Sequence, residues 1–227
     1  MPQRTALPET VVGIDVETTS LDPAAGEIIE VSAIKYHLGE EVQIAEFTRL
    51  CRPRAPLAAQ ITAITGITNE MVGQSPAFAD LRDELQEFIG ESLLFAHNAS
   101  FDIGFLTYHG LKIEVNPVWD TFMLASVAWP EAESYNLGLL AAQLGIVVAG
   151  EHRAGDDVRL TWQLLEKIRE QLATSPETHQ HITEVLVKSS QEQYLALFTT
   201  TPATPTTPSI PLTTSPGLAA ARPPSPP

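Results

Sequence analysis

The segment that spans residues 11–20 reads VVGIDVETTS. It begins as an apolar run of strand-forming residues, and the side chains of a strand alternate between its two faces. Alternate apolar residues therefore share one face, and Asp15 and Glu17 project together from the other. In an isolated strand these two acids would be solvated surface charges. This strand is apolar enough to be central, where unpaired carboxylates are costly unless a cation or a proton compensates them.

The segments around this strand predict an α/β fold. Two strand-forming runs follow it with Gly39 between them, and their close spacing leaves no room for crossover helices, so an antiparallel meander is expected. Shorter strands then alternate with segments of helical periodicity. The expected strands are 11–17, 28–36, 42–50, 93–96 and 118–120, and the expected helices are 76–89, 101–109, 121–127, 137–144 and 155–172. This order predicts a mixed five-stranded sheet with helices on both faces, the outline of a ribonuclease-H-like fold.

The ends of the chain differ in composition from the rest. Residues 199–227 contain half of the 18 prolines and a single charged residue, Arg222, so we expect a disordered, locally polyproline-like tail. The remaining chain suits one catalytic domain with extensions. The predicted organisation is an N-terminal extension at 1–9, the catalytic domain at 10–175, a C-terminal helix or partner-binding extension at 176–198, and the tail.

Charge and cysteine content limit the class of protein. The formal net charge of -15 argues against a protein that grips long duplex DNA through many phosphate contacts. An enzyme that binds a few terminal nucleotides can neutralise their phosphates with metal ions while a basic partner holds the rest. Cys51 is the only cysteine, which excludes a disulfide framework and a thiolate zinc site. No apolar stretch reaches the roughly 20 residues of a membrane span, so we expect a cytoplasmic protein.

A second group of polar residues, HNASFD at 97–102, lies where an expected strand meets an expected helix. Ligand sites of α/β proteins form at such junctions. Asp102 is expected in the first turn of the helix, where the macrodipole favours a carboxylate. Asn98 is either a cap of that helix or a contact to substrate, and its glycosylation sequon is set aside because no secretory signal is expected. Phe101 fits core packing and substrate contact equally well.

A third group, HRAGDD at 152–157, precedes the longest expected helix. His152 is expected just outside this helix and Asp157 in its first turn. A histidine before a helix is usually incidental. Beside a third carboxylate, however, an imidazole that titrates near neutral pH is suited to take a proton from a metal-bound water.

The three groups together resemble the motifs of the DEDD exonuclease superfamily, in the branch with a histidine in the third motif. The proofreading (epsilon) subunits of bacterial DNA polymerase III belong to this branch. The matching motifs are DVETTS at 15–20, HNASFD at 97–102 and HRAGDD at 152–157, and agreement extends to ITAITGITNEMV at 61–72, WDT at 119–121 and YNLGLLAAQLGI at 135–146. The resemblance covers residues 11–172.

The resemblance implies a metal-dependent reaction. Asp15, Glu17, Asp102 and Asp157 would hold two divalent cations, Mg²⁺ or Mn²⁺, about 3.5 to 4 Å apart. His152 would be the general base. The products would be a 5′ mononucleotide and a strand shortened by one unit.

The resemblance also implies contacts to the substrate. Thr18 and Thr19 would approach the terminal nucleotide, and Thr65 would contact its base, although threonines in strands and turns are more often structural. The interval from the histidine favours Asp157 over Asp156 as the metal ligand. Asp156 is then an acid that interacts with the helix dipole, and an exchange of the two roles stays open.

The leading hypothesis is therefore a metal-dependent 3′-to-5′ exonuclease that acts on the single-stranded 3′ end of DNA and proofreads with a polymerase catalytic subunit. One alternative is a stand-alone exonuclease for RNA or short oligonucleotides, which the motifs do not separate from the first. Another is an inactive module between polymerase and clamp, against which the intact acids argue. QYLALF, which starts at Gln193 and ends at Phe198, loosely resembles sliding-clamp binding motifs, and an amphipathic helix from about 181 explains it equally well.

Overall fold

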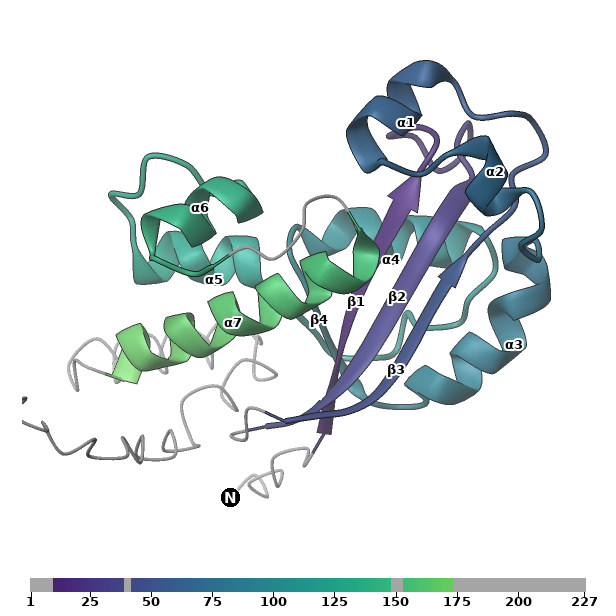
Figure 1. Cartoon of the computed structure of the whole chain (residues 1–227). Helices are drawn as coiled ribbons and strands as arrows, with labels where there is room; N and C mark the ends of the chain where they lie inside the picture. The colour runs from purple at the N-terminus through teal and green to yellow at the C-terminus, as the bar shows by residue number, and fades with distance from the viewer. Residues whose placement is uncertain (1–9, 39–41, 148–152, 174–227) are drawn as a thin grey trace, which may run out of the picture.

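The computed structural model describes residues 10–38, 42–147 and 153–173 (Figure 1). His152, the extensions predicted at 1–9 and 176–198, the segment QYLALF and the tail at 199–227 therefore lie outside the described residues. In the part of the chain that is described, none of the helices combines the length and the apolarity that a membrane span requires.

A mixed five-stranded sheet with the order β3-β2-β1-β4-β5 forms the centre of the fold. The strands are β1 (Thr10–Thr18), β2 (Ile28–His37), β3 (Gln43–Leu50), β4 (Leu93–Ala96) and β5 (Val118–Asp120). Strands β1, β2 and β3 form the expected antiparallel meander, and β4 and β5 run parallel to β1. The predicted α/β architecture is confirmed, with the acidic strand β1 in the middle of the sheet.

Helices cover both faces of the sheet (Figure 1). They are α1 (Ala59–Thr65), α2 (Asn69–Val72), α3 (Phe78–Ile89), α4 (Ala99–Tyr108), α5 (Thr121–Ala128), α6 (Leu137–Gln143) and α7 (Ala154–Ala173). Helix α7 crosses β1 and β2 on one face, where α5 and α6 pack against it. Helices α3 and α4 share a second core with the opposite face.

The helices differ from the prediction in three features, one of which is that α3 begins at Phe78, two residues later than expected. Helices α1 and α2 were not expected, because the sequence of α1, AQITAIT, is rich in β-branched residues that favour strands. Packing decides instead: Ile67 and Val72 share a small core with Ile29 of β2, and Gly66 ends α1 with a φ of 69°. Helix α4 begins at Ala99, two residues earlier than expected.

The contact between α7 and β1 depends on Gly13. A Cβ at this position would lie 2.6 Å from Cγ1 of Val158 in α7 and 2.4 Å from the Phe95 ring. Such distances are not tolerated in a packed core. The missing side chain therefore allows the first turns of α7 to lie directly on the central strand.

Strand β4 is much shorter than its neighbour β1. It pairs with β1 only from Val11 to Gly13. Among the described residues, the second half of β1 therefore has β2 as its only strand partner. Backbone N–H groups that point away from β2 in this half need another acceptor, because an unpaired buried N–H group is costly.

Candidate active site

Three carboxylates meet at the carboxyl end of β1. Asp15, Glu17 and Asp157 each offer an oxygen atom within 4.8 Å of the others. Asp15 and Glu17 lie on the face of β1 that α7 covers, and Asp157 comes from the first turn of α7. Carboxylates at this spacing repel one another unless a proton or a cation compensates them. This set of hard oxygen donors could hold a divalent cation.

Asp102 reaches the same region from α4, on the other face of the sheet. Its side chain is buried, and its Oδ1 accepts a hydrogen bond of 3.0 Å from the backbone N–H of Val16. That bond satisfies one of the N–H groups that the short strand β4 leaves open. Asp102 lies in the first turn of α4, as predicted. It is not a member of the 4.8 Å group, so its role as a metal ligand stays a prediction.

The pKa values of these acids reflect burial and mutual repulsion. Burial, followed by the charges of Asp102 and Asp157, raises the pKa of Asp15 well above its ordinary value. Burial and the charge of Asp157 raise the pKa of Glu17 to about 8. Burial also raises the pKa of Asp102 to about 8, although the hydrogen bond from Val16 acts in the opposite direction. Without a cation, burial and mutual repulsion therefore favour the protonated forms of Asp15, Glu17 and Asp102.

The neighbouring acids Asp156 and Asp157 have different surroundings. Asp157 belongs to the carboxylate group, whereas Oδ1 of Asp156 accepts a bond of 3.4 Å from Arg159, one helical turn further along α7. This arrangement agrees with the expectation that Asp157 faces the cluster.

Glu30 of β2 is a fifth carboxylate in this region that the sequence analysis did not single out. It lies opposite Glu17 in the β1–β2 ladder and is 1% exposed. The guanidinium of Arg153 and the backbone N–H of Ala154 donate hydrogen bonds to it. An acid inside the apolar run IIEVSAI is the sequence signal that could have identified it.

The segment before α4 is held by Asp120, at the end of β5. Its carboxylate accepts hydrogen bonds from the backbone N–H groups of Asn98, Ala99 and Phe122, at 3.1, 3.2 and 2.9 Å. Asn98 has a φ of 62°, a conformation that non-glycine residues adopt rarely. Its side chain makes no capping bond to α4, so the cap, one of the two roles considered for Asn98, is supplied by Asp120.

His97 completes this network. Its ring nitrogens bond with the Thr121 hydroxyl at 2.9 Å and with the carbonyl oxygen of Tyr135 at 2.7 Å. Burial lowers the pKa of His97, which favours the neutral imidazole. Together, Asp120 and His97 fix the loop from which α4 carries Asp102 to the cluster.

The predicted substrate contacts have contrasting surroundings. The hydroxyls of Thr18 and Thr19 bond to nearby backbone groups, and the buried Thr65 hydroxyl bonds to two backbone groups in and just after α1. All three threonines therefore have structural roles. Asn98 is exposed, and Phe101 is half-buried, with its ring 4.9 Å from that of Phe105. Substrate contact by these five residues stays a prediction.

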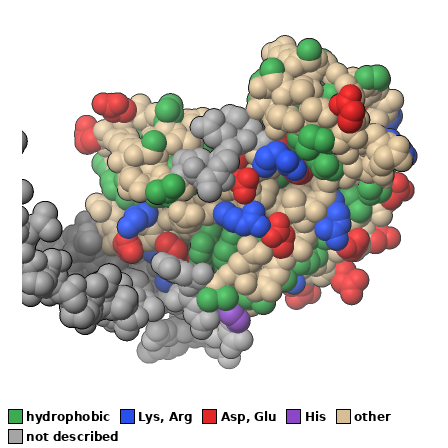
Figure 2. Space-filling model, in the orientation of Figure 1, with side chains coloured by type: hydrophobic (Ala, Val, Ile, Leu, Met, Phe, Trp, Pro, Cys, Tyr) green, Lys and Arg blue, Asp and Glu red, His purple; other side chains and the backbone are tan. Residues whose placement is uncertain are grey.

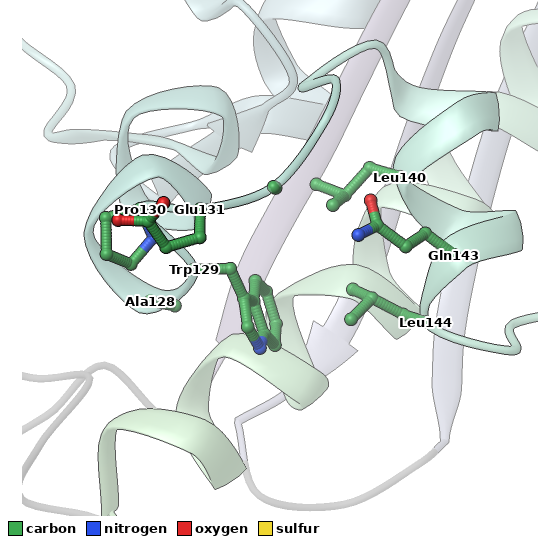
Figure 3. A pocket seen from close by; sticks show the side chains of 8 residues that line it. Ala128, Trp129, Pro130, Glu131, Leu140, Gln143 and Leu144 are labelled. Atoms are coloured by element: carbon green, nitrogen blue, oxygen red, sulfur yellow. The ribbon is translucent and has the colours of Figure 1, made fainter.

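A separate hollow lies between α5 and α6 (Figure 3). It is lined by Ala128, Trp129, Pro130, Glu131, Ala132, Leu140, Gln143 and Leu144. Its single acid has no second carboxylate, histidine or cysteine beside it in the lining. The lining therefore lacks the paired acids or bases that hydrolysis requires, and the carboxylate cluster is the better candidate.

Comparisons with known proteins identify the family of this chain. Residues 12–165 match the sequence model of the RNase_T family, described as exonuclease. PolC-type DNA polymerase III of Bacillus subtilis is 36% identical over 191 residues, which are 82% of this chain and 13% of that protein. The Clostridium perfringens protein of the same name is 34% identical over 188 residues, 82% of this chain and 12% of that protein. The chain thus spans about an eighth of the length of these relatives.

Solved structures show the same fold. Exonuclease X in complex with 5′ overhanging duplex DNA has a TM-score of 0.58 and 27% identity, and the match covers 74% of this chain and 96% of that one. Escherichia coli exonuclease I in complex with a dT13 oligonucleotide has a TM-score of 0.62 and 20% identity, over 79% and 44% of the two chains. The family match at residues 12–165 includes all the described acids of the cluster. Because it covers more than half of the chain, the chain belongs to the exonuclease family.

Proposed function

We propose that this chain is a metal-dependent 3′-to-5′ exonuclease that hydrolyses terminal phosphodiesters of DNA and releases 5′ mononucleotides. The observation that carries this proposal is the meeting of Asp15, Glu17 and Asp157 within 4.8 Å, from segments far apart in an exonuclease-family chain. Two divalent cations held by these acids and Asp102 would polarise the scissile phosphate and lower the pKa of the attacking water.

The residues of the chain have separate roles in this proposal. Asp15 and Glu17 would serve as cation ligands in their ionised forms, and Asp157 would add a third carboxylate from α7. Asp102 holds the backbone of β1 through Val16 and contributes the fourth acid. His152 accepts the proton of the attacking water, a role that an imidazole can perform near neutral pH.

Two of the comparisons support DNA as the substrate. Exonuclease X, a similar protein of known structure, was solved in complex with duplex DNA that has a 5′ overhang. The PolC-type relatives are named as DNA polymerases, which supports a proofreading role beside a polymerase catalytic subunit. A basic partner would also compensate for the net charge of -15.

The first experiment determines polarity and substrate. The full chain is incubated with Mg²⁺ or Mn²⁺ and single-stranded DNA labelled at its 5′ end, and with RNA of the same sequence. We expect a ladder of labelled products that shorten one nucleotide at a time from the 3′ end, with release of 5′ mononucleotides and faster turnover of DNA. Faster turnover of RNA would favour the alternative of a stand-alone RNA exonuclease. If neither strand is degraded, the result would favour the alternative of an inactive interaction module between polymerase and clamp.

A second experiment assigns the site. Asp15→Ala and Asp157→Ala are expected to abolish metal-dependent release of mononucleotides while the circular dichroism spectrum stays that of the wild type. Asp156→Ala is the matched control, because its carboxylate bonds to Arg159 outside the cluster and its loss should leave most of the activity. Wild-type rates in Asp15→Ala or Asp157→Ala would contradict the assignment.

The role of His152 needs a different readout. His152→Ala is expected to lower the rate by several orders of magnitude and to leave metal affinity, measured by calorimetry, largely unchanged. A loss of metal affinity with an unchanged maximal rate would contradict a role as general base.

Partner binding is tested by co-purification of the full chain with a polymerase catalytic subunit and, separately, with a sliding clamp. The change Leu197→Ala within QYLALF is the specific test of the clamp contact. It should reduce capture of the clamp and leave the exonuclease rate on short single strands unchanged.

A further inference from the structure

Glu30 and Arg153 form an ion pair between the sheet and the start of α7. The Nε atom of Arg153 donates to both carboxylate oxygens of Glu30, at 3.2 and 3.0 Å, and its Nη2 donates to Oε1. The second oxygen of Glu30 also accepts a bond of 3.0 Å from the backbone N–H of Ala154. Glu30 is 1% exposed, while the Arg153 side chain is 40% exposed. The Glu30 carboxylate therefore accepts hydrogen bonds both from the Arg153 side chain, just before α7, and from the N–H group of Ala154, the first residue of the helix.

This pair is adjacent to the candidate active site on two sides. Glu30 lies opposite Glu17 in the β1–β2 ladder. Arg153 is followed by the first turn of α7, which carries Asp157 into the cluster. One ion pair thus connects the strand beside one carboxylate of the cluster with the helix turn that supplies another.

The chemistry of the pair favours a geometric role over a purely stabilising one. An ion pair with a buried carboxylate gains little free energy compared with apolar residues of similar size, because the carboxylate loses its hydration. Its special property is direction: the guanidinium fork and the carboxylate meet in a narrow range of orientations. The apolar contact of Val158 with Gly13 sets how closely α7 approaches β1, but apolar contacts are non-directional and do not fix an orientation as this bond does.

We infer that Glu30 and Arg153 are positioning residues, which fix the first turn of α7 so that Asp157 reaches Asp15 and Glu17. The inference rests on the proposed function where it concerns the reaction, because His152, the residue joined to Arg153 by a peptide bond, is the proposed base. Neither Glu30 nor Arg153 belongs to the carboxylate group itself. Glu30 and Arg153 act indirectly, because they fix the position of Asp157.

A second ion pair on the same helix provides a matched comparison. Arg159 of α7 pairs with Glu46 of β3, and both side chains are partly exposed, at 39% and 30%. Figure 2 shows basic and acidic side chains side by side on this face of the molecule, in agreement with this pair and with Lys167–Glu170. The Arg159–Glu46 pair also joins α7 to the sheet, but it lies beyond the turn that carries Asp157.

The test uses Glu30→Gln, Arg153→Gln, the double variant and Arg153→Lys in the full chain, with Arg159→Gln as the control. Below the melting temperature of each variant, we expect kcat on single-stranded DNA to fall roughly 100-fold, the cost of a misplacement of about 1 Å at an active site, with KM within about threefold. The double variant should lose no more than the worse single variant, because both changes break one link. Arg153→Lys should stay impaired, because an ammonium keeps the charge but not the fork.

A readout without catalysis separates this inference from the proposed function. Mn²⁺ binding, measured by calorimetry in the absence of DNA, should weaken at least tenfold in Glu30→Gln and Arg153→Lys and stay at the wild-type value in Arg159→Gln. A wild-type chain that binds Mn²⁺ but degrades no DNA would refute the proposed function and leave the positioning role intact. Variants that melt at lower temperature but keep wild-type kcat and Mn²⁺ affinity would overturn the inference, as would full activity in Arg153→Lys.

Discussion

Val158 of α7 lies directly over Gly13 of β1, and a Cβ at position 13 would be 2.6 Å from Cγ1 of Val158. Asp157 immediately precedes Val158, so this contact also sets how closely the third carboxylate approaches the strand that carries Asp15. Gly13 carries no reactive group. It nevertheless determines the site, because its missing side chain lets a helix and a strand bring their acids together.

Gly13→Ala is therefore expected to impair both folding and catalysis. The added methyl group meets Val158 and Phe95, and overpacking of this kind costs about 1–3 kcal/mol. Urea unfolding measures the loss in free energy, and the rate of mononucleotide release should fall at least tenfold. Gly104→Ala in α4 is the control, because a Cβ there meets nothing within 4 Å. That change should be neutral or stabilise the helix by up to about 1 kcal/mol, with activity unchanged.

Asp15→Asn is expected to stabilise the metal-free protein while it abolishes activity. The change removes a buried charge that Asp102, Asp157 and Glu17 all repel. At pH 8 with a chelator present, the free energy of unfolding should rise, because a neutral amide can be buried there without a proton or a cation to compensate it. Asp156→Asn should give no such gain, since it loses its bond to Arg159. Equal effects of the two changes would show that the repulsion is unimportant.

The stability of the metal-free protein should fall as the pH rises. Glu17 and Asp102 have pKa values of about 8 in the folded protein, above their ordinary values of 4.5 and 3.8. Between these limits the folded state binds more protons than the unfolded state, so each such group costs up to about 1.4 kcal/mol per pH unit. Melting temperatures measured with a chelator should therefore decrease from pH 5 to pH 8. With Mg²⁺ in excess the decrease should be smaller, because the cation binds the ionised acids; parallel curves would contradict this linkage.

Asp120→Ala should disturb the site from outside the carboxylate cluster. Its carboxylate accepts three backbone hydrogen bonds at the starts of α4 and α5, and the loss of one such cap typically costs about 1 kcal/mol. The loop that contains Asn98 would then lose its support, and the rate should fall together with the melting temperature. Asp80→Ala is the control, because Asp80 bonds the backbone N–H of Ala77 at α3, a helix that carries no residue of the site. It should lower stability and leave the rate per folded molecule unchanged.

Local patterns in the sequence were sufficient to predict the strands and most helices. Apolar runs and helical periodicity reflect burial directly, and the acids of the cluster lie where these elements begin or end. Helix α1 was missed, because the β-branched residues of ITAIT favour a strand in the isolated sequence. In the folded chain, the packing of Ile67 against Ile29 decides the structure of this region. The beginning of α4 was misplaced, because Asp120, far along the chain from Asn98, supplies its cap.

Contacts between distant residues set the limit of prediction from this sequence. Glu30 and Arg153 are 123 residues apart, and nothing in either local segment reveals that they pair. Gly13 resembles any small residue in a strand until Val158 is placed above it. The identity of the acids can be predicted from sequence motifs. The contacts that position them depend on which surfaces meet in the folded chain.

The short strand β4 has one more consequence. Because β4 ends at Ala96, Asp102 of the α4 layer reaches the backbone of Val16 in β1, a strand whose acids Asp15 and Glu17 face the α7 layer. A cation bound by both Asp102 and Asp157 would link the α4 layer to the α7 layer beyond the end of β4. Local separation of either layer would then have to release the metal first, so metal loading should slow amide hydrogen exchange at the first turns of both α4 and α7 together.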